Sequence, residues 1–144
     1  MLVRDIMAQP VRTIAAAATA QEAAELMALH DVGALPVHEN ERIVGIVTDR
    51  DLVLRVMAPG LEAGLIPVSR IMTPDPAAVG PSASVADTAR FITSVRVRRL
   101  PVVEDGRVVG MVTVDDIAQH CDDESLVLLM ERRVAPRWRG RKTA

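Results

Sequence analysis

The sequence is almost without aromatic side chains. Its 144 residues contain one Trp, one Phe and no Tyr. Proteins that read RNA or single-stranded DNA commonly stack the bases on aromatic rings, so this composition argues against such a platform. The core must instead be aliphatic, and with 49% of the chain hydrophobic there is enough material for a stable fold. This length makes one ordinary domain or two small lobes that share a core.

Cysteine is equally scarce, since Cys121 is the only one. A single cysteine can form neither an intrachain disulfide nor a cysteine-rich zinc site, which favours a reducing compartment. No apolar run approaches the roughly 18 residues of a transmembrane helix, and residues 1–10 lack the apolar core of a signal peptide. We therefore expect a cytoplasmic protein with no membrane partner.

Cationic charge is concentrated at the C-terminus. The net charge is only -2, which gives no global attraction to nucleic acid. Residues 132–144, however, hold no acid and six cationic side chains, namely Arg132, Arg133, Arg137, Arg139, Arg141 and Lys142. Such a basic tail is usually a solvated chain end. The alternative is that the tail, which also contains Trp138, grips an acidic partner, a neighbouring subunit or nucleic acid.

Signatures of catalysis and metal binding are missing as well. The chain has no phosphate-binding Gly-rich loop, no zinc-protease motif and no nucleophile elbow. Cys121 beside His120 is a poor thiol nucleophile, because adjacent helical residues point about 100° apart. His30, His38 and His120 do not stand at a ligand-like spacing. We expect no catalytic residues and no metal site.

The sequence does contain an internal repeat. Residues 6–52 align without gaps to residues 71–117 at a constant offset of 65, and 15 of these 47 positions are identical. A unit of this size has only a marginal core by itself, so we expect the two copies to pack on each other as one module. The predicted divisions are a first repeat at 1–58, a linker at 59–67, a second repeat at 68–121, and a C-terminal helix with the basic tail at 122–144.

Each copy presents the same order of local signals, which is strand, helix, strand, strand, helix. Hydroxyl N-caps at Thr19 and Ser84 begin the first helices, and Asp105-Gly106 suits the type I′ turn of a hairpin. We predict an α/β fold, more strictly α+β, with two tandem repeats packed about a pseudo-two-fold axis. The predicted strands are Val11–Ile14, Leu35–His38 and Arg42–Val47 in the first copy, and Ala77–Val79, Leu100–Val103 and Arg107–Val112 in the second.

A Thr-x-x-Asp pattern follows the last strand of each copy, at Thr48 with Asp51 and at Thr113 with Asp116. A strand end that leads into a helix start offers free N–H groups to a phosphate, and a carboxylate can accept both hydroxyls of a ribose. The same pattern is also a helix capping box, which explains both copies without any ligand. The residues alone leave the two interpretations open.

The order of these motifs resembles the cystathionine β-synthase (CBS) domain over about residues 3–121. The Ile-Met opening, the Leu-Pro-Val strand and the apolar-Gly-apolar-apolar-Thr-x-x-Asp ending all occur twice, so the chain looks like a tandem CBS pair, or Bateman module. Several longer segments are similar in particular to bacterial hypoxic-response CBS-pair proteins. These segments are His30–Pro36, Thr48–Val53, Ala58–Leu61, Val97–Pro101 and Asp116–His120.

This resemblance implies a stand-alone regulatory protein that binds an adenosine-containing ligand in two clefts between the repeats. The implied ligand is AMP, ADP, ATP or S-adenosylmethionine, with no other cofactor required. Output would pass through an unknown effector protein or through assembly, with a homodimer expected, in a stress or low-oxygen response. The alternative is an assembly or partner-binding protein with vestigial clefts and a basic interaction tail.

The family positions also indicate site residues. Thr48 and Thr113 correspond to phosphate contacts, and Asp51 and Asp116 to ribose contacts. Adenine would be held by backbone and aliphatic groups at Thr13, Ile14, Ala34 and Leu35 in one half, and at Ala78, Val79, Arg99 and Leu100 in the other.

Arginine distinguishes the two halves. Arg98 or Arg99 could neutralise a phosphate with paired N–H donors, whereas the first half has Gly33 and Ala34 at these positions. The alternative is a solvated surface or salt bridges to nearby acids. We expect only one of the two clefts to favour a charged nucleotide. Candidate residues for a dimer surface, with the internal core as the alternative, are Met27, Leu54, Met57 and Ile92.

Overall fold

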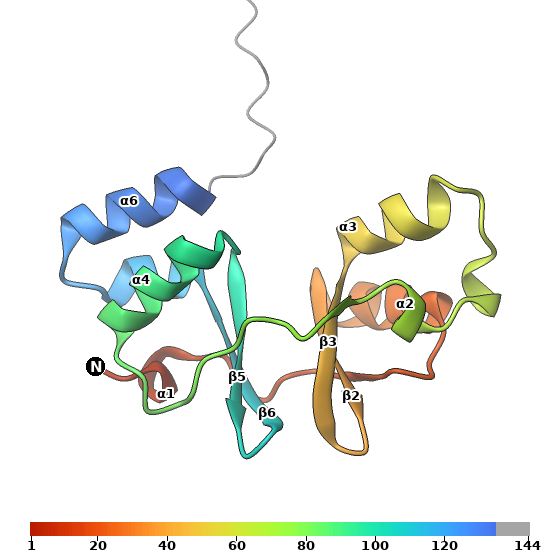
Figure 1. Cartoon of the computed structure of the whole chain (residues 1–144), viewed down its shortest axis with the longest axis horizontal. Helices are drawn as coiled ribbons and strands as arrows, with labels where there is room; N and C mark the ends of the chain where they lie inside the picture. The colour runs from red at the N-terminus through yellow and green to blue at the C-terminus, as the bar shows by residue number, and fades with distance from the viewer. Residues whose placement is uncertain (135–144) are drawn as a thin grey trace, which may run out of the picture.

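The computed structural model describes residues 1–134 as two lobes, each with a β-hairpin toward the middle and helices on the outside (Figure 1). The first half contains α1 (Val3–Ile6), β1 (Ile14–Ala15), α2 (Ala20–His30), β2 (Ala34–Glu39), β3 (Arg42–Thr48), α3 (Asp49–Leu52) and a π-helix (Val53–Met57). Two 3₁₀ turns, Ala63–Leu65 and Val68–Arg70, follow. The second half contains β4 (Thr73–Pro74), α4 (Val85–Val95), β5 (Arg99–Glu104), β6 (Arg107–Thr113), α5 (Val114–His120) and α6 (Glu124–Val134).

The predicted helix starts are confirmed. The hydroxyl of Thr19 accepts a hydrogen bond from the N–H of Glu22 at 3.1 Å, and that of Ser84 accepts from the N–H of Asp87 at 3.0 Å. These bonds satisfy backbone donors that the first helical turn leaves without intrahelical partners. As a result α2 and α4 begin at positions separated by the 65-residue offset of the repeat.

The two predicted hairpins are also confirmed. β2 pairs antiparallel with β3, and β5 with β6. Both residues of each turn have positive φ, at 50° and 65° for Asn40 and Glu41 and at 51° and 79° for Asp105 and Gly106. Positive φ at both central residues defines the type I′ geometry, whose twist matches that of the strands.

The first strands of the two copies are shorter than predicted. Only Ile14–Ala15 forms β1, which pairs parallel with β2. In the second copy Ala77–Val79 is not a strand, and Val79 makes a single parallel bridge to Val102. The short strand of this region is instead β4, which pairs antiparallel with Gly45 and Ile46 of β3. A strand of two residues, Thr73–Pro74, is too short to leave a periodic pattern in the sequence.

The opening segment of each copy packs against the opposite copy. The N–H of Val3 donates to the carbonyl of Ala83, and Ala8 bridges Met111 in β6. In the reciprocal direction, β4 joins the sheet of the first copy and the N–H of Ala20 donates to the carbonyl of Ile66. This exchange interlocks the two repeats into one module.

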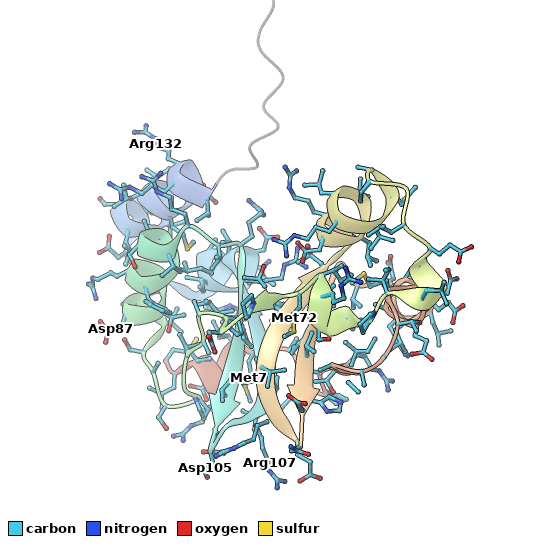
Figure 2. All side chains as sticks on the ribbon, turned by 45° about the vertical axis from the view of Figure 1, so that its right-hand side comes forward. Met7, Met72, Asp87, Asp105, Arg107 and Arg132 are labelled. Carbon is cyan, nitrogen blue, oxygen red and sulfur yellow. The ribbon has the colours of Figure 1, made fainter. Side chains whose placement is uncertain are left out.

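The hydrophobic core follows the same exchange. Val3 is fully buried in the cluster of the second lobe, whereas Val68 and Ile71 are buried in that of the first. The methionines of the two Ile-Met openings cover glycines of the opposite hairpins, Met7 over Gly110 and Met72 over Gly45. Figure 2 shows both methionine side chains near the middle of the molecule. The cores are therefore built from both repeats.

Two of the residues considered for a dimer surface belong to the core. Met27 is 7% exposed and Ile92 is fully buried, so the prediction that they form a surface was wrong. Met27 belongs to the core cluster of the first lobe and Ile92 to that of the second. Leu54 and Met57, by contrast, are 51% and 72% exposed. They remain candidates for an interface.

Candidate functional site

Two cavities lie where the repeats meet. Cavity A has a volume of about 390 Å³ and cavity B about 270 Å³. Cavity A is lined by Ile46, Thr48, Asp49, Arg50, Asp51, Thr73, Pro76, Ala77, Val97, Arg98, Arg99 and Pro101. Cavity B is lined by Ala8, Pro10, Val11, Arg12, Val32, Gly33, Ala34, Arg99, Met111 and Thr113.

The 65-residue offset relates the two cavities. Thr48 corresponds to Thr113, Thr73 to Ala8, and Val97 to Val32, and each member of a pair lines its own cavity. Each cavity combines the end of a hairpin strand from one repeat with two segments of the other repeat. The pseudo-two-fold fold therefore produces two versions of one site.

Thr48 and Asp51 form a capping box on the wall of cavity A. The backbone N–H of Thr48 donates to Asp51 Oδ2 at 2.9 Å, and the N–H of Asp51 donates to Thr48 Oγ1 at 3.2 Å. The Asp51 side chain is 14% exposed, and its Oδ1 lies 3.9 Å from Nε of Arg55. Capping thus occupies one carboxylate oxygen, and the Asp51 carboxylate still borders the cavity.

The equivalent box in the second repeat is tighter. Asp116 Oδ2 accepts from both the N–H and the hydroxyl of Thr113, at 2.8 Å each. The hydroxyl of Thr48 makes no such bond to Asp51 among the hydrogen bonds of residues 1–134. Thr113 borders cavity B, whereas Asp116 is not one of its lining residues. The structure thus brings three of the four predicted Thr and Asp residues to the cavities.

Both predicted arginines reach the cavities. Arg98 lines cavity A, and its Nη1 donates to the carbonyl of Val134 at 2.8 Å. Arg99 lines both cavities, and its side chain forms no hydrogen bond or salt bridge within the described chain. Its Nη1 would lie 3.4 Å from a Cβ atom placed on Gly33. An unpaired guanidinium between two cavities is available to an anion in either one.

The predicted adenine contacts lie in different places. Ala34 lines cavity B. Leu35 and Leu100 are fully buried and Ile14 is 3% exposed, so their side chains contribute to the core rather than to a cavity wall. Thr13 lines a third cavity near the hairpin tips, and Ala78 and Val79 line neither cavity A nor cavity B. Ala77, next to the predicted pair, does line cavity A.

Sequence reasoning missed several lining residues. Asp49 and Arg50 stand inside the Thr-x-x-Asp pattern, where the second copy has Val114 and Asp115. Thr73, Pro76 and Arg12 come from the segments after the Ile-Met pairs, which the exchange between repeats carries into the cavities. The repeat offset could have paired these positions, although only the fold shows that they face the opposite repeat.

Residues 1–134 contain no group of three or more His, Cys, Asp or Glu side chains placed to hold a metal ion. Within the same residues, no helix is long and apolar enough to span a membrane. The basic tail, apart from Arg132 and Arg133 in α6, lies outside the described residues.

Fold and cavities together define a tandem module with two related cavities between its repeats. A family model of the CBS domain matches residues 3–58 and 68–123, and the chain belongs to this family as a tandem CBS pair. It is 40% identical over 116 residues to the CBS domain-containing protein YhcV of Bacillus subtilis, covering 81% of this chain and 82% of that one. It is 33% identical over 134 residues to Hypoxic response protein 1 of Mycobacterium tuberculosis, covering 92% and 94%. The predicted family is confirmed.

Solved structures agree with this assignment. Hypoxic Response Protein I with two coordinated zinc ions superposes with a TM-score of 0.75 at 35% identity, over 83% of this chain and 98% of that one. The CBS domain pair of protein MJ0100, in complex with 5′-methylthioadenosine and S-adenosylmethionine, gives a TM-score of 0.73 at 29% identity, over 83% and 94%. The CBS pair of MJ0100 therefore binds two adenosine-containing ligands.

Proposed function

We propose that this protein is a non-enzymatic regulatory CBS pair that binds an adenosine-containing ligand in the cavities between its repeats. The proposal includes the division into repeats at 1–58 and 68–121 with a linker at 59–67. It also includes a cytoplasmic location, favoured by the single cysteine. The observation that carries the proposal is the meeting of Thr48 and Asp51 from one repeat with Arg98 and Arg99 from the other in cavity A.

The chemistry of cavity A suits a nucleotide. Its volume of about 390 Å³ falls in the range of small-molecule sites. The guanidinium groups can pair with phosphate oxygens, and the Asp51 carboxylate can accept ribose hydroxyls. Ile46, Val97 and Ala77 provide an apolar wall for a purine. These groups support an anionic adenosine derivative as the ligand.

Calorimetric titration tests this proposal. We expect saturable binding of one or more of AMP, ADP, ATP and S-adenosylmethionine to the full chain. Asp51→Asn preserves size and an acceptor oxygen for the capping box, and it should weaken binding at cavity A. Asp116→Asn is the matched control, because Asp116 caps a helix but does not line a cavity. Absence of binding for all four ligands would refute the proposal.

A homodimer and an effector partner complete the proposed function. Val53, Leu54 and Met57 are 51%, 51% and 72% exposed on the helical segment after β3. Adjacent exposed apolar side chains of this size favour a protein interface. Light scattering should give twice the chain mass for the wild type, and Leu54→Glu should shift it to the monomer. A monomeric wild type would refute the dimer.

The rival proposal is an assembly protein with vestigial clefts and a basic interaction tail. Its supporting observation is the concentration of cations in residues 132–144. Removing residues 135–144 and measuring oligomer mass and DNA retention at two salt concentrations distinguishes the two. Unchanged values favour the ligand-binding function, whereas loss of assembly favours the rival.

A further inference from the structure

The Arg98 side chain connects cavity A to the C-terminal end of α6. It lines the cavity, and its Nη1 donates to the backbone carbonyl of Val134 at 2.8 Å, across 36 positions of sequence. Val134 is the last residue of α6. One guanidinium therefore belongs both to the candidate ligand site and to the end of a helix outside the two repeats.

α6 is anchored along one face. Leu126 is partly buried, Met130 is fully buried and Val134 is 4% exposed, and their spacing of four places them on one side of the helix. On the other side Leu128 and Leu129 are 57% and 46% exposed. The last four carbonyls of a helix have no intrahelical partner and form its partially negative end. Arg98 thus satisfies and neutralises the end of α6.

An anion bound in cavity A would compete with the carbonyl of Val134 for the Arg98 guanidinium. Both bonds have a charged donor, but a phosphate is also a charged acceptor and can take two parallel N–H bonds from a guanidinium, so the ligand is the stronger acceptor. The side chain of the neighbouring Arg99 makes no such bond to α6, so its pairing with a ligand would leave the helix unchanged. In cavity B the equivalent of Arg98 is Gly33, which has no side chain to make this link. The connection therefore exists at only one of the two cavities.

We propose that an anionic ligand in cavity A draws Arg98 away from Val134 and loosens the last turn of α6. The inference rests on the proposed ligand binding and specifies how it is regulated and read out. Occupancy of one cavity is converted into a change at a helix that carries exposed Leu128 and Leu129. The signal reaches the surface without any change in the packing of the hairpins.

Hydrogen exchange of the full chain tests the inference, with ADP as the anionic probe and adenosine as its uncharged control. Without ligand, Arg98→Gln should speed exchange of the amides of residues 131–134 by about 10- to 100-fold, as loss of a bond to a charged donor predicts. Arg99→Gln is the matched control and should leave them unchanged. Saturating ADP should speed the same amides in the wild type, whereas adenosine should not.

Arg98→Lys provides a second variant that keeps the charge, and it should retain part of the ADP response. Failure of AMP, ADP, ATP and S-adenosylmethionine to bind by calorimetry would overturn the proposed function and this inference with it. Binding of ADP with unchanged or slower exchange in residues 131–134 would overturn the inference alone.

Discussion

Replacing Gly45 by alanine tests whether the exchange between repeats holds the cavities together. A Cβ atom on Gly45 would lie 2.9 Å from both Cγ of Met72 and the carbonyl oxygen of Thr73, and closer still to Met72 Sδ. A Cβ atom on Gly110 would meet Met7 in the same way, with Cγ at 2.9 Å and Cβ at 3.2 Å, but no backbone atom is among its nearest neighbours. At Gly110 only a flexible methionine side chain would have to move, whereas at Gly45 a backbone atom would have to move as well.

The difference sets the expected magnitudes. Overpacking a core costs about 1–3 kcal/mol, and a flexible methionine can relieve part of it. At Gly45 the backbone oxygen of Thr73 belongs to β4, which cannot shift without weakening its pairing with β3. We therefore expect Gly45→Ala to lower the free energy of unfolding by about 2–3 kcal/mol, and Gly110→Ala by about 1 kcal/mol or less.

Urea denaturation of the two variants measures these values directly. Gly64→Ala is the control for the intrinsic effect of alanine, because nothing lies within 4 Å of a Cβ at that position. A double-mutant cycle with Met72→Ala should recover part of the loss at Gly45, since the methionine side chain is one of the two obstacles. Equal losses at Gly45 and Gly110, or no coupling to Met72, would refute this reasoning.

Two further predictions concern the cavity walls. Thr113→Ala should cost about 1 kcal/mol of stability in urea denaturation, and more than Thr48→Ala, because only the Thr113 hydroxyl also donates to its capping carboxylate; equal losses would contradict this. In two-site calorimetry Arg99→Gln should weaken the binding of anionic ligands about 10-fold at both cavities, whereas Arg98→Gln should weaken it at cavity A alone. An effect of Arg99→Gln on a single site would show that the two cavities do not share this guanidinium.

The sequence predicted the fold well wherever the signal was local and doubled. Thr19 and Ser84 cap helices that begin 65 residues apart, and Asp105-Gly106 forms the expected turn. Each of these features depends on a few neighbouring residues, and the repeat supplied a second copy of each pattern. The short strands were not predicted correctly, because two paired residues such as Ile14–Ala15 leave no periodic pattern in the sequence.

The site was predictable only in part, because its walls come from both repeats. Thr48 and Asp51 follow from a local pattern, and Arg98 and Arg99 from a local excess of charge. The contribution of Arg12 depends on where the segment after Met7 runs once Met7 covers Gly110. That path is a tertiary contact over about a hundred residues, for which a single sequence contains no local signal.

The same exchange changes how the charge difference between the halves is interpreted. The excess of arginine in the second half predicted a single cationic cleft, yet Arg99 borders both cavities and Arg12 adds a second cation to cavity B. Cavity A also contains the carboxylates of Asp49 and Asp51, whereas no acidic residue lines cavity B. Because opposite charges nearby offset the attraction of a phosphate, the smaller cavity is the more uniformly cationic one. The two cavities of this duplicated sequence thus differ in charge, because each repeat contributes different residues to the walls of the two sites.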